Sequence, residues 1–251
     1  MDASHCCHRR SQQTATDLLD AVLDLLVPTR CAGCAAPHTQ FCAACRELLR
    51  AVAPFQVETG SRPGAGRGLP EVYAVAPYAD PVRQLILAHK ERGAVRLARP
   101  LGEALASAVR AAVRARPGPE APPLLLVPVP SARTAVRARG HDPMRRLTRE
   151  AARALRSAAV PARVLPALRL TRTVADQAGL RAEQRRRNLS GALDVAPRWE
   201  AALARGRVVL VDDLITTGAT LAEATRALTA SGADVLAIAA VAATTRRRRR
   251  P

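Results

Sequence analysis

The chain has 251 residues, an apolar content of 48% and a formal net charge of +18. This length predicts one large or two small domains with enough apolar side chains for a core. A membrane span is excluded because no segment has the roughly 18 consecutive apolar residues that it needs. The N-terminus also lacks the apolar region of a signal peptide, so we expect a cytoplasmic protein.

The charge and the aromatic content together narrow the expected partners. Even without the arginine run at residues 246–250 the chain stays strongly basic, which makes polyanionic partners plausible. Aromatic residues make up only 2% of the chain. This scarcity argues against a platform of stacked bases for single-stranded nucleic acid, whereas arginine contacts to a phosphate backbone fit the composition.

The N-terminal part divides into a tail and a short module. We expect residues 1–15 to be a disordered tail and residues 16–55 to contain a helix followed by a metal-binding module. Residues 16–27 have apolar side chains at helical spacing and precede a proline, which predicts a helix that packs on the module or on the main domain.

Two Cys-x-x-Cys pairs follow, separated by seven residues. In a reducing compartment such cysteines bind a metal or stay free more readily than they form disulfides. Two pairs at this spacing predict a Cys₄ site for Zn²⁺, and four protein ligands leave no open position, so the role is structural. The alternative, a thioredoxin-like redox pair, needs a single pair on a βαβ unit. The expected zinc ligands are Cys31, Cys34, Cys42 and Cys45.

The main domain is expected to begin after a linker at residues 56–70, which are rich in Gly, Pro and Arg. From residue 71 to residue 243, segments with strand and helix patterns alternate. This alternation predicts an α/β fold with a mostly parallel sheet flanked by helices, and such sheets bind ligands at the carboxyl ends of their strands. We expect strands at 71–78, 121–130, 208–211 and 234–241, and helices at 82–92, 101–114, 143–158 and 220–230.

An arginine-rich loop is expected after the strand at 121–130. Guanidinium groups bind phosphate oxygens in a bidentate manner, and a serine hydroxyl at the strand end adds a further donor. We interpret the loop as a candidate pyrophosphate site, which Lys90 and Arg92 can approach. The alternative is a solvated surface in an arginine-rich chain. The candidate pyrophosphate-binding residues are Ser131, Arg133, Arg137 and Arg139.

The segment 208–220 is the most informative part of the chain. An apolar run without polar alternation predicts a strand buried on both faces, and it ends in Asp212 and Asp213. A hydroxyl-rich turn then leads into a helix, and Gly218 lets this turn expose its backbone N–H groups. These donors and the helix N-terminus suit a phosphate, and the acidic pair beside them suits the hydroxyls of a sugar phosphate. The candidate phosphate-binding residues are Thr216, Thr217, Gly218, Ala219 and Thr220.

This segment resembles the signature of type I phosphoribosyltransferases, although an ordinary buried strand with an Asp-rich turn is the alternative. The resemblance implies that Asp212 and Asp213 contact the ribose hydroxyls of phosphoribosyl pyrophosphate and that the loop at 216–220 binds the 5′-phosphate. It also implies Mg²⁺ between pyrophosphate and ribose oxygens in an active enzyme. The sequence provides no identifiable nucleobase pocket, and no catalytic nucleophile, acid or base can be assigned.

Further motifs resemble the ComF family of competence-associated proteins. They are the Val-Pro-Val-Pro run at 127–130 with its arginines, the segment Ala-His-Lys-Glu-Arg-Gly at 88–93, and the stretch 172–193. Together with the cysteine pairs, the resemblance covers nearly all of residues 20–243. The sequence departs from the family at 140–143, where Gly-His-Asp-Pro replaces the usual Gly-Phe-Asn-Gln. Within 172–193, the polar residues that we interpret as a loop near the site or as a plain surface loop are Asp176, Gln177, Arg187 and Asn188.

Three functions are compatible with these motifs. The first is a ComF-like protein of DNA uptake and natural transformation, which binds phosphoribosyl pyrophosphate or related phosphates and contacts single-stranded DNA and a DNA-uptake helicase. The second is an active phosphoribosyltransferase of nucleotide metabolism. The third is a regulator that binds phosphoribosyl pyrophosphate without turnover. The resemblance favours the first, with a phosphoribosyltransferase-like domain at 71–243 and a basic tail at 244–251.

Overall fold

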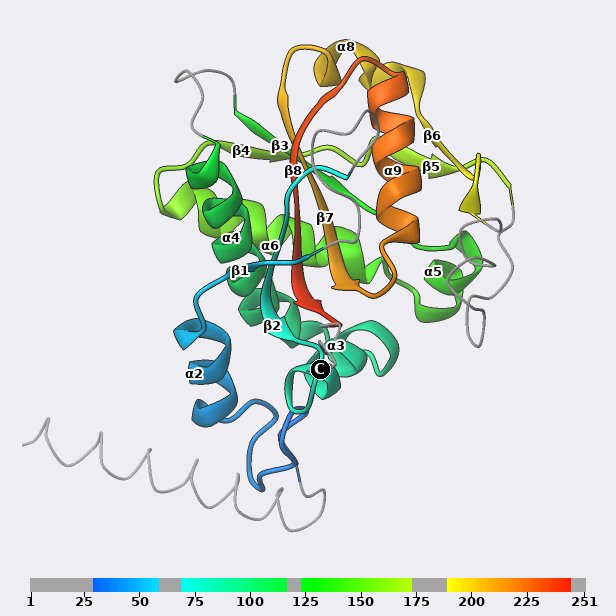
Figure 1. The fold of residues 1–251 in the computed structure, drawn as a ribbon. Helices are drawn as coiled ribbons and strands as arrows, with labels where there is room; N and C mark the ends of the chain where they lie inside the picture. The colour runs from blue at the N-terminus through cyan, green and yellow to red at the C-terminus, as the bar shows by residue number, and fades with distance from the viewer. Residues whose placement is uncertain (1–28, 59–68, 117–122, 173–188, 245–251) are drawn as a thin grey trace, which may run out of the picture.

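The computed structural model describes residues 29–58, 69–116, 123–172 and 189–244 (Figure 1). The helix expected at 16–27, the polar residues between 176 and 188 and the arginine run at 246–250 lie outside this part of the chain. Among the described residues, none of the helices combines the length and the apolarity needed to cross a bilayer.

A six-stranded sheet forms the centre of the molecule, in the order β1-β2-β8-β7-β3-β4. The predicted parallel sheet is confirmed: every neighbouring pair is parallel except β1 and β2, which are antiparallel. The strands are β1 (Phe55–Gln56), β2 (Val72–Pro77), β3 (Leu124–Pro128), β4 (Ala162–Val164), β7 (Arg207–Ile215) and β8 (Asp234–Ala243).

Helices cover both faces of the sheet, because alternate residues of its buried strands point into two separate cores. Val209 and Val211 of β7 belong to the core under the first group of helices, whereas Val208 and Leu210 belong to the core on the other side. The first group consists of α2 (Ala43–Ala51), α3 (Val82–Glu91), η1 (Val95–Leu97), α4 (Ala98–Ala115) and α6 (Pro143–Ser157).

The opposite face is covered by α9 (Ala219–Ala230) and by a small antiparallel sheet of β5 (Leu168–Leu170) and β6 (Leu193–Val195) (Figure 1). The short helices η2 (Pro197–Trp199) and α8 (Glu200–Leu203) lead from β6 into β7. Glu223 of α9 is buried and accepts hydrogen bonds from the Leu193 backbone N–H at 3.2 Å and from the Arg226 guanidinium at 2.7 Å. This contact fixes the small sheet to α9.

The structure extends β7 beyond the predicted strand end at Val211. The strand continues to Ile215, because Asp212 pairs with Ala240 and Leu214 pairs with Ala242 of β8. The acidic pair therefore lies within the last paired residues of the strand rather than on a free tip. The backbone at both carboxylates is held by the neighbouring strand.

The expected arginine loop after β3 is instead a helix, α5 (Arg133–Arg139). Gly140 ends it with a φ of 72°, a left-handed conformation that suits glycine. Asp142 then caps α6 by accepting a hydrogen bond from the Arg145 backbone N–H, and Pro143 occupies the first turn. The unusual tetrapeptide at 140–143 thus ends one helix and starts the next.

The cysteine module packs directly on the main domain. Cys31, Cys45 and Leu49 are buried in the same core as Leu85 of α3 and Leu101 of α4. The expected linker is ordered at its beginning, since Gln56 pairs with Tyr73 in the main sheet.

Candidate functional site

The acidic pair on β7 is partnered by a lysine from α3. The Lys90 ammonium lies 2.8 Å from Asp213 Oδ2 and 3.1 Å from Oδ1, and the Asp213 side chain is buried. The Asp213 backbone N–H donates to Asp212 Oδ1 at 2.8 Å. The pair and the lysine therefore form one compact cluster at the carboxyl end of β7.

The two carboxylates have different electrostatic surroundings. Burial raises the pKa of Asp212 to about 7, and repulsion from Asp213 adds to this rise while Lys90 opposes it. For Lys90, burial lowers the pKa, but attraction to Asp213 and Asp212 outweighs burial and the net direction is upward. Lys90 thus stays charged, whereas Asp212 changes its ionisation near neutral pH.

The loop after β7 has the geometry of an anion-binding turn. Gly218 adopts a φ of 74° and stands immediately before the first residue of α9. Thr216 and Thr217 are exposed, and the Thr217 hydroxyl accepts a long hydrogen bond of 3.4 Å from the Ala219 backbone N–H. The N–H groups of the first turn of α9, including that of Thr220, lack partners within the helix and suit an anion.

Thr244, which sequence reasoning missed, anchors this loop. Its backbone N–H donates to the Ile215 carbonyl at 2.8 Å, and its hydroxyl donates to the Thr216 carbonyl at 3.1 Å. Thr244 directly follows β8, the strand beside β7. A signal for it exists in the sequence, because a polar residue at the end of a neighbouring parallel strand lies at the same edge of the sheet.

The residues that follow β3 lie beside β7 next to the acidic pair. Pro128 pairs with Val211, and the Val129 backbone N–H donates to the Val211 carbonyl at 3.0 Å. Ser131, two residues after Val129, lines a cavity of about 370 Å³ together with Arg133 and Arg137. The structure therefore brings the first part of the predicted arginine site to the same edge of the sheet as the acidic pair.

The other predicted cations have different partners. Arg139 does not line this cavity and instead forms an ion pair with Glu91 at 3.1 Å. Lys90 binds Asp213 rather than the arginine group. Arg92 donates to Gln84 Oε1 at 2.8 Å and lines a separate cleft. Of the six predicted basic or hydroxyl groups, Ser131, Arg133 and Arg137 are thus the three that meet.

The four cysteines of the module form a cluster in which every pair of sulfur atoms lies within 4.8 Å. Cys31 and Cys45 Sγ are 3.7 Å apart, and Cys34 and Cys42 Sγ are 3.5 Å apart. Four ligands at the usual Zn–S distance of about 2.3 Å around a tetrahedral centre stand about 3.8 Å from one another. The cluster could therefore hold a zinc ion.

Backbone groups support this cluster. The Cys42 N–H donates to Cys31 Sγ and the Cys45 N–H donates to Cys42 Sγ, both at 3.4 Å. Burial raises the pKa of Cys31, but backbone hydrogen bonds outweigh burial and lower it to about 6, whereas burial and the neighbouring thiols raise the pKa of Cys45. The backbone at position 33 approaches Cys45 so closely that glycine is required, because a Cβ there would lie 2.8 Å from Cys45 Sγ.

No curated protein matches the chain. Seven chains of solved structures match; one is a mutant hypoxanthine phosphoribosyltransferase from Trypanosoma cruzi in a ternary complex with substrates. It is 18% identical, with 62% of this chain and 73% of that chain covered and a TM-score of 0.35.

A family model gives the more direct comparison, since residues 155–251 match the phosphoribosyl transferase domain. This match includes β7, the acidic pair and the following loop, but not β3 or the cysteine module. The predicted fold class is confirmed: a phosphoribosyltransferase-like α/β fold with a mostly parallel sheet flanked by helices, and a Cys₄ cluster before it.

Proposed function

We propose that the chain binds phosphoribosyl pyrophosphate, or a closely related sugar phosphate, at the carboxyl ends of β3 and β7. One observation carries this proposal: β3 and β7 are adjacent and parallel, so the acidic pair, the glycine turn and the Ser131 loop share one edge of the sheet. Phosphate, ribose and pyrophosphate groups of one ligand then have separate partners within reach.

In this proposal each part of the ligand is bound by a different type of group. Asp212 and Asp213 accept hydrogen bonds from the ribose hydroxyls. The turn at 216–220 donates backbone and hydroxyl hydrogen atoms to the 5′-phosphate. Ser131, Arg133 and Arg137 bind the pyrophosphate, and Arg139 joins them when it exchanges Glu91 for a phosphate oxygen.

Lys90 has a specific part in ribose binding. Its ion pair with Asp213 neutralises one of two adjacent carboxylates, which keeps them stable together in a buried place. Lys90 lies within hydrogen-bond distance of both Asp213 oxygens, so ribose hydroxyls would use the remaining lone pairs of these oxygens. Lys90 is therefore proposed to position Asp213 rather than to contact the ligand first.

The chemistry that this arrangement supports is transfer of a phosphoribosyl group with release of pyrophosphate. A Mg²⁺ ion bound with the ligand would supply neutralisation of the phosphate charge. Arg133 and Arg137 stabilise the negative charge of the leaving pyrophosphate, and the carboxylates favour positive charge on the ribose ring. A group that activates an acceptor is not assigned.

For the cellular role, we propose a ComF-like protein of DNA uptake, with single-stranded DNA and a DNA-uptake helicase as partners. The cysteine cluster before a phosphoribosyltransferase-like domain and the Val-Pro-Val-Pro run with its arginines support this proposal. We propose residues 16–55 and 71–243 as its two functional parts. An active enzyme of nucleotide metabolism and a regulator without turnover are the alternatives.

The ribose assignment is tested with Asp213→Asn and isothermal titration calorimetry. The amide keeps the size of the side chain but loses the Lys90 ion pair and one acceptor, so we expect at least about ten-fold weaker binding of phosphoribosyl pyrophosphate. Asp234→Asn is a matched control, because Asp234 begins β8 at the opposite end of the sheet. Equal affinity of Asp213→Asn and the unchanged protein would refute the ribose role.

A second measurement separates the three cellular roles. Pyrophosphate release is followed with a panel of nucleobases, and binding of single-stranded DNA is measured at two salt concentrations. Turnover with one base identifies an enzyme of nucleotide metabolism, whereas salt-dependent DNA binding without turnover supports the DNA-uptake role. Binding of phosphoribosyl pyrophosphate with neither property identifies the regulator.

A further inference from the structure

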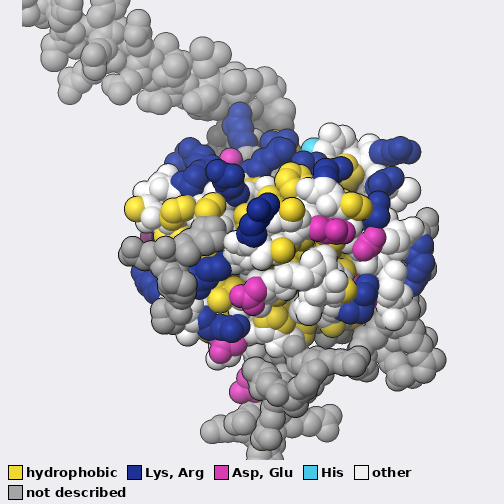
Figure 2. Space-filling view, turned by 90° about the horizontal axis from the view of Figure 1, so that it is seen from above, with side chains coloured by type: hydrophobic (Ala, Val, Ile, Leu, Met, Phe, Trp, Pro, Cys, Tyr) yellow, Lys and Arg dark blue, Asp and Glu magenta, His cyan; other side chains and the backbone are white. Residues whose placement is uncertain are grey.

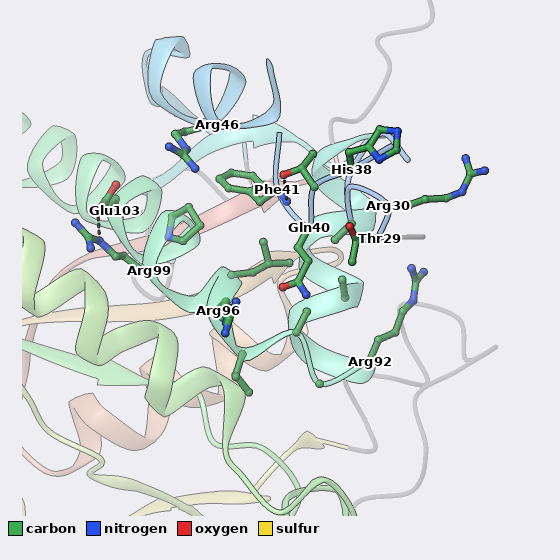
Figure 3. A pocket seen from close by; sticks show the side chains of 18 of the residues that line it. Thr29, Arg30, His38, Gln40, Phe41, Arg46, Arg92, Arg96, Arg99 and Glu103 are labelled. Carbon is green, nitrogen blue, oxygen red and sulfur yellow. Dashed lines mark hydrogen bonds and ion pairs between the residues drawn. The ribbon is translucent and has the colours of Figure 1, made fainter. Parts of the chain in front are cut away.

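A large cavity lies away from the acidic pair, between the cysteine module and the helices α3, η1 and α4 (Figure 3). Its volume of about 1300 Å³ exceeds the roughly 300–1,000 Å³ typical of small-molecule pockets. A second cavity of about 220 Å³ shares Arg46, Arg50 and Glu103 with it and continues along α4 to Arg110. We call the two together the interdomain groove.

Arginines line both walls of the interdomain groove. The cysteine module and α2 contribute Arg30 and Arg46, and the opposite wall contributes Arg92, Arg96 and Arg99 (Figure 3). Arg50 of α2 also lines the cavity. Among the described residues that line the larger cavity, Glu103 is the one carboxylate.

The few internal contacts leave most of this positive charge available. Glu103 is shared, at 3.5 Å from Arg50 and 3.1 Å from Arg99, and both arginine side chains are more than 60% exposed. The described residues provide no ion pair for Arg30 or Arg96, which are both exposed. The positive charges of these arginines repel one another, and a bound polyanion would reduce this repulsion.

The residue type and the shape indicate a chain of phosphates. Arginine presents a planar fork that matches phosphate oxygens, and arginines line both cavities of the groove. The arginines from Arg30 to Arg110 are distributed over two adjoining cavities, so a ligand with a single phosphate would contact only a few of them. An extended phosphodiester backbone contacts them in succession.

One aromatic side chain lies in the groove. Phe41 is half-buried, and the Arg46 guanidinium stands 5.5 Å from the centre of its ring. A single ring offers one stacking position, far fewer than the series of rings that a base-reading platform uses. The groove is therefore suited to the backbone of a strand and not to its sequence.

We propose that the interdomain groove binds single-stranded nucleic acid through its phosphates, without sequence preference. We specify a single strand because its flexible backbone can bend to meet arginines of both walls, whereas a duplex is stiff over lengths of this size. This inference rests on the nucleic-acid part of the proposed function and is independent of the sugar-phosphate site on β7.

The test uses the full chain and a fluorescein-labelled deoxythymidine oligonucleotide, with anisotropy measured from 50 to 200 mM salt. The double variant Arg30→Glu with Arg96→Glu removes one cation from each wall. Each phosphate contact to a single strand contributes about 0.7 to the slope of log Kd against log salt, so we expect the slope to fall by about 1.4. At 50 mM salt we expect affinity to fall at least ten-fold.

The control is Arg149→Glu with Arg205→Glu, which makes the same charge change at two exposed arginines outside the groove. We expect this control to keep most of its affinity and its slope. If the double reversal fails to fold, as judged by its thermal melting, Arg30→Gln with Arg96→Gln takes its place, with the same direction expected. Equal binding by the groove variant and the control would overturn the proposal.

Three further ligands decide which polyanion is bound. An abasic oligonucleotide of equal length should bind within about three-fold of the deoxythymidine strand, because the phosphates carry the contact. A duplex that binds as tightly as the single strand, or inorganic polyphosphate that binds at least ten-fold more tightly, would overturn the proposal.

Calorimetry with phosphoribosyl pyrophosphate distinguishes the interdomain groove from the sugar-phosphate site on β7. The groove variant should retain its affinity for phosphoribosyl pyrophosphate, and Asp213→Asn should retain its affinity for the oligonucleotide. If the unchanged protein does not bind phosphoribosyl pyrophosphate, the sugar-phosphate proposal is refuted and the groove assignment is unaffected.

Discussion

Asp212 and Asp213 are adjacent in the sequence but differ in their electrostatic surroundings. Asp213 is paired with Lys90 at 2.8 Å, whereas the pKa of Asp212 is raised to about 7 by burial and by the charge of Asp213. The sequence indicated the acidic pair but not this division of roles. The division depends on Lys90, which lies 123 residues away along the chain.

The raised pKa of Asp212 predicts a pH-dependent affinity for phosphoribosyl pyrophosphate. Only the ionised carboxylate is a full acceptor for ribose hydroxyls, and a group with a pKa of about 7 is ionised about ten-fold more at pH 8 than at pH 6. We therefore expect affinity to rise about ten-fold from pH 6 to pH 8, measured by calorimetry.

Asp212→Asn is the control for this dependence, because the 5′-phosphate itself titrates near pH 6. The variant should bind more weakly at pH 8 and show only the shallower dependence of the ligand. If affinity depends on pH in the same way for Asp212→Asn and for the unchanged protein, Asp212 does not titrate between pH 6 and pH 8.

At the scale of the elements, the long apolar segments were predictable and the short ones were not. The strand at 208–211 and the helix at 143–158 were expected from their apolar patterns and are present as parts of β7 and α6. β4, β5 and β6 have three residues each, too few to show a period. α5 has no buried residue and hence no apolar face to recognise.

The packing of α4 on α6 depends on a glycine at their contact. A Cβ at Gly102 would lie 2.5 Å from Glu150 Cβ and 2.9 Å from the Ala151 backbone nitrogen, so the helices would have to separate. We expect Gly102→Ala to lower the free energy of unfolding by about 1–3 kcal/mol in urea denaturation.

Ala115→Leu is the comparison for this variant, since it adds side-chain volume at the exposed end of the same helix. It should leave stability within about 0.5 kcal/mol of the unchanged protein. Undiminished stability of Gly102→Ala would show that α4 and α6 are less closely packed than described.

At the scale of the whole molecule, net charge alone does not locate a binding surface. Lys and Arg side chains are spread over the face shown in Figure 2, with Asp and Glu scattered between them. The interdomain groove differs because six arginines line its larger cavity, whose lining residues include a single carboxylate. The sequence predicted polyanionic partners, but only the fold brings arginines of residues 30–50 next to those of residues 92–110.

The cysteine cluster is expected to melt together with the main domain. Cys31 and Cys45 share a core with Leu85 and Leu101, so loss of a bound metal should weaken the common core. We expect purified protein to contain about one zinc per chain, and chelation to lower its single melting temperature, measured by calorimetry and metal analysis.

Cys34→Ser provides a matched variant, because Cys34 is the exposed member of the cluster. It should lower the metal content and the melting temperature in the same direction as the chelator. Two separate transitions, with the upper one unaffected by chelation, would contradict the shared core.

The end of α3 links the two candidate sites. Lys90 contacts Asp213, and Arg92, two residues later, lines the interdomain groove. Lys90 is the next-to-last residue of α3 and Arg92 directly follows this helix, so one end of α3 serves both sites. If a ligand at either site shifts this end of α3, each ligand alters the affinity for the other by the same factor, as thermodynamic linkage requires. Strand binding and sugar-phosphate binding would then act as mutual effectors.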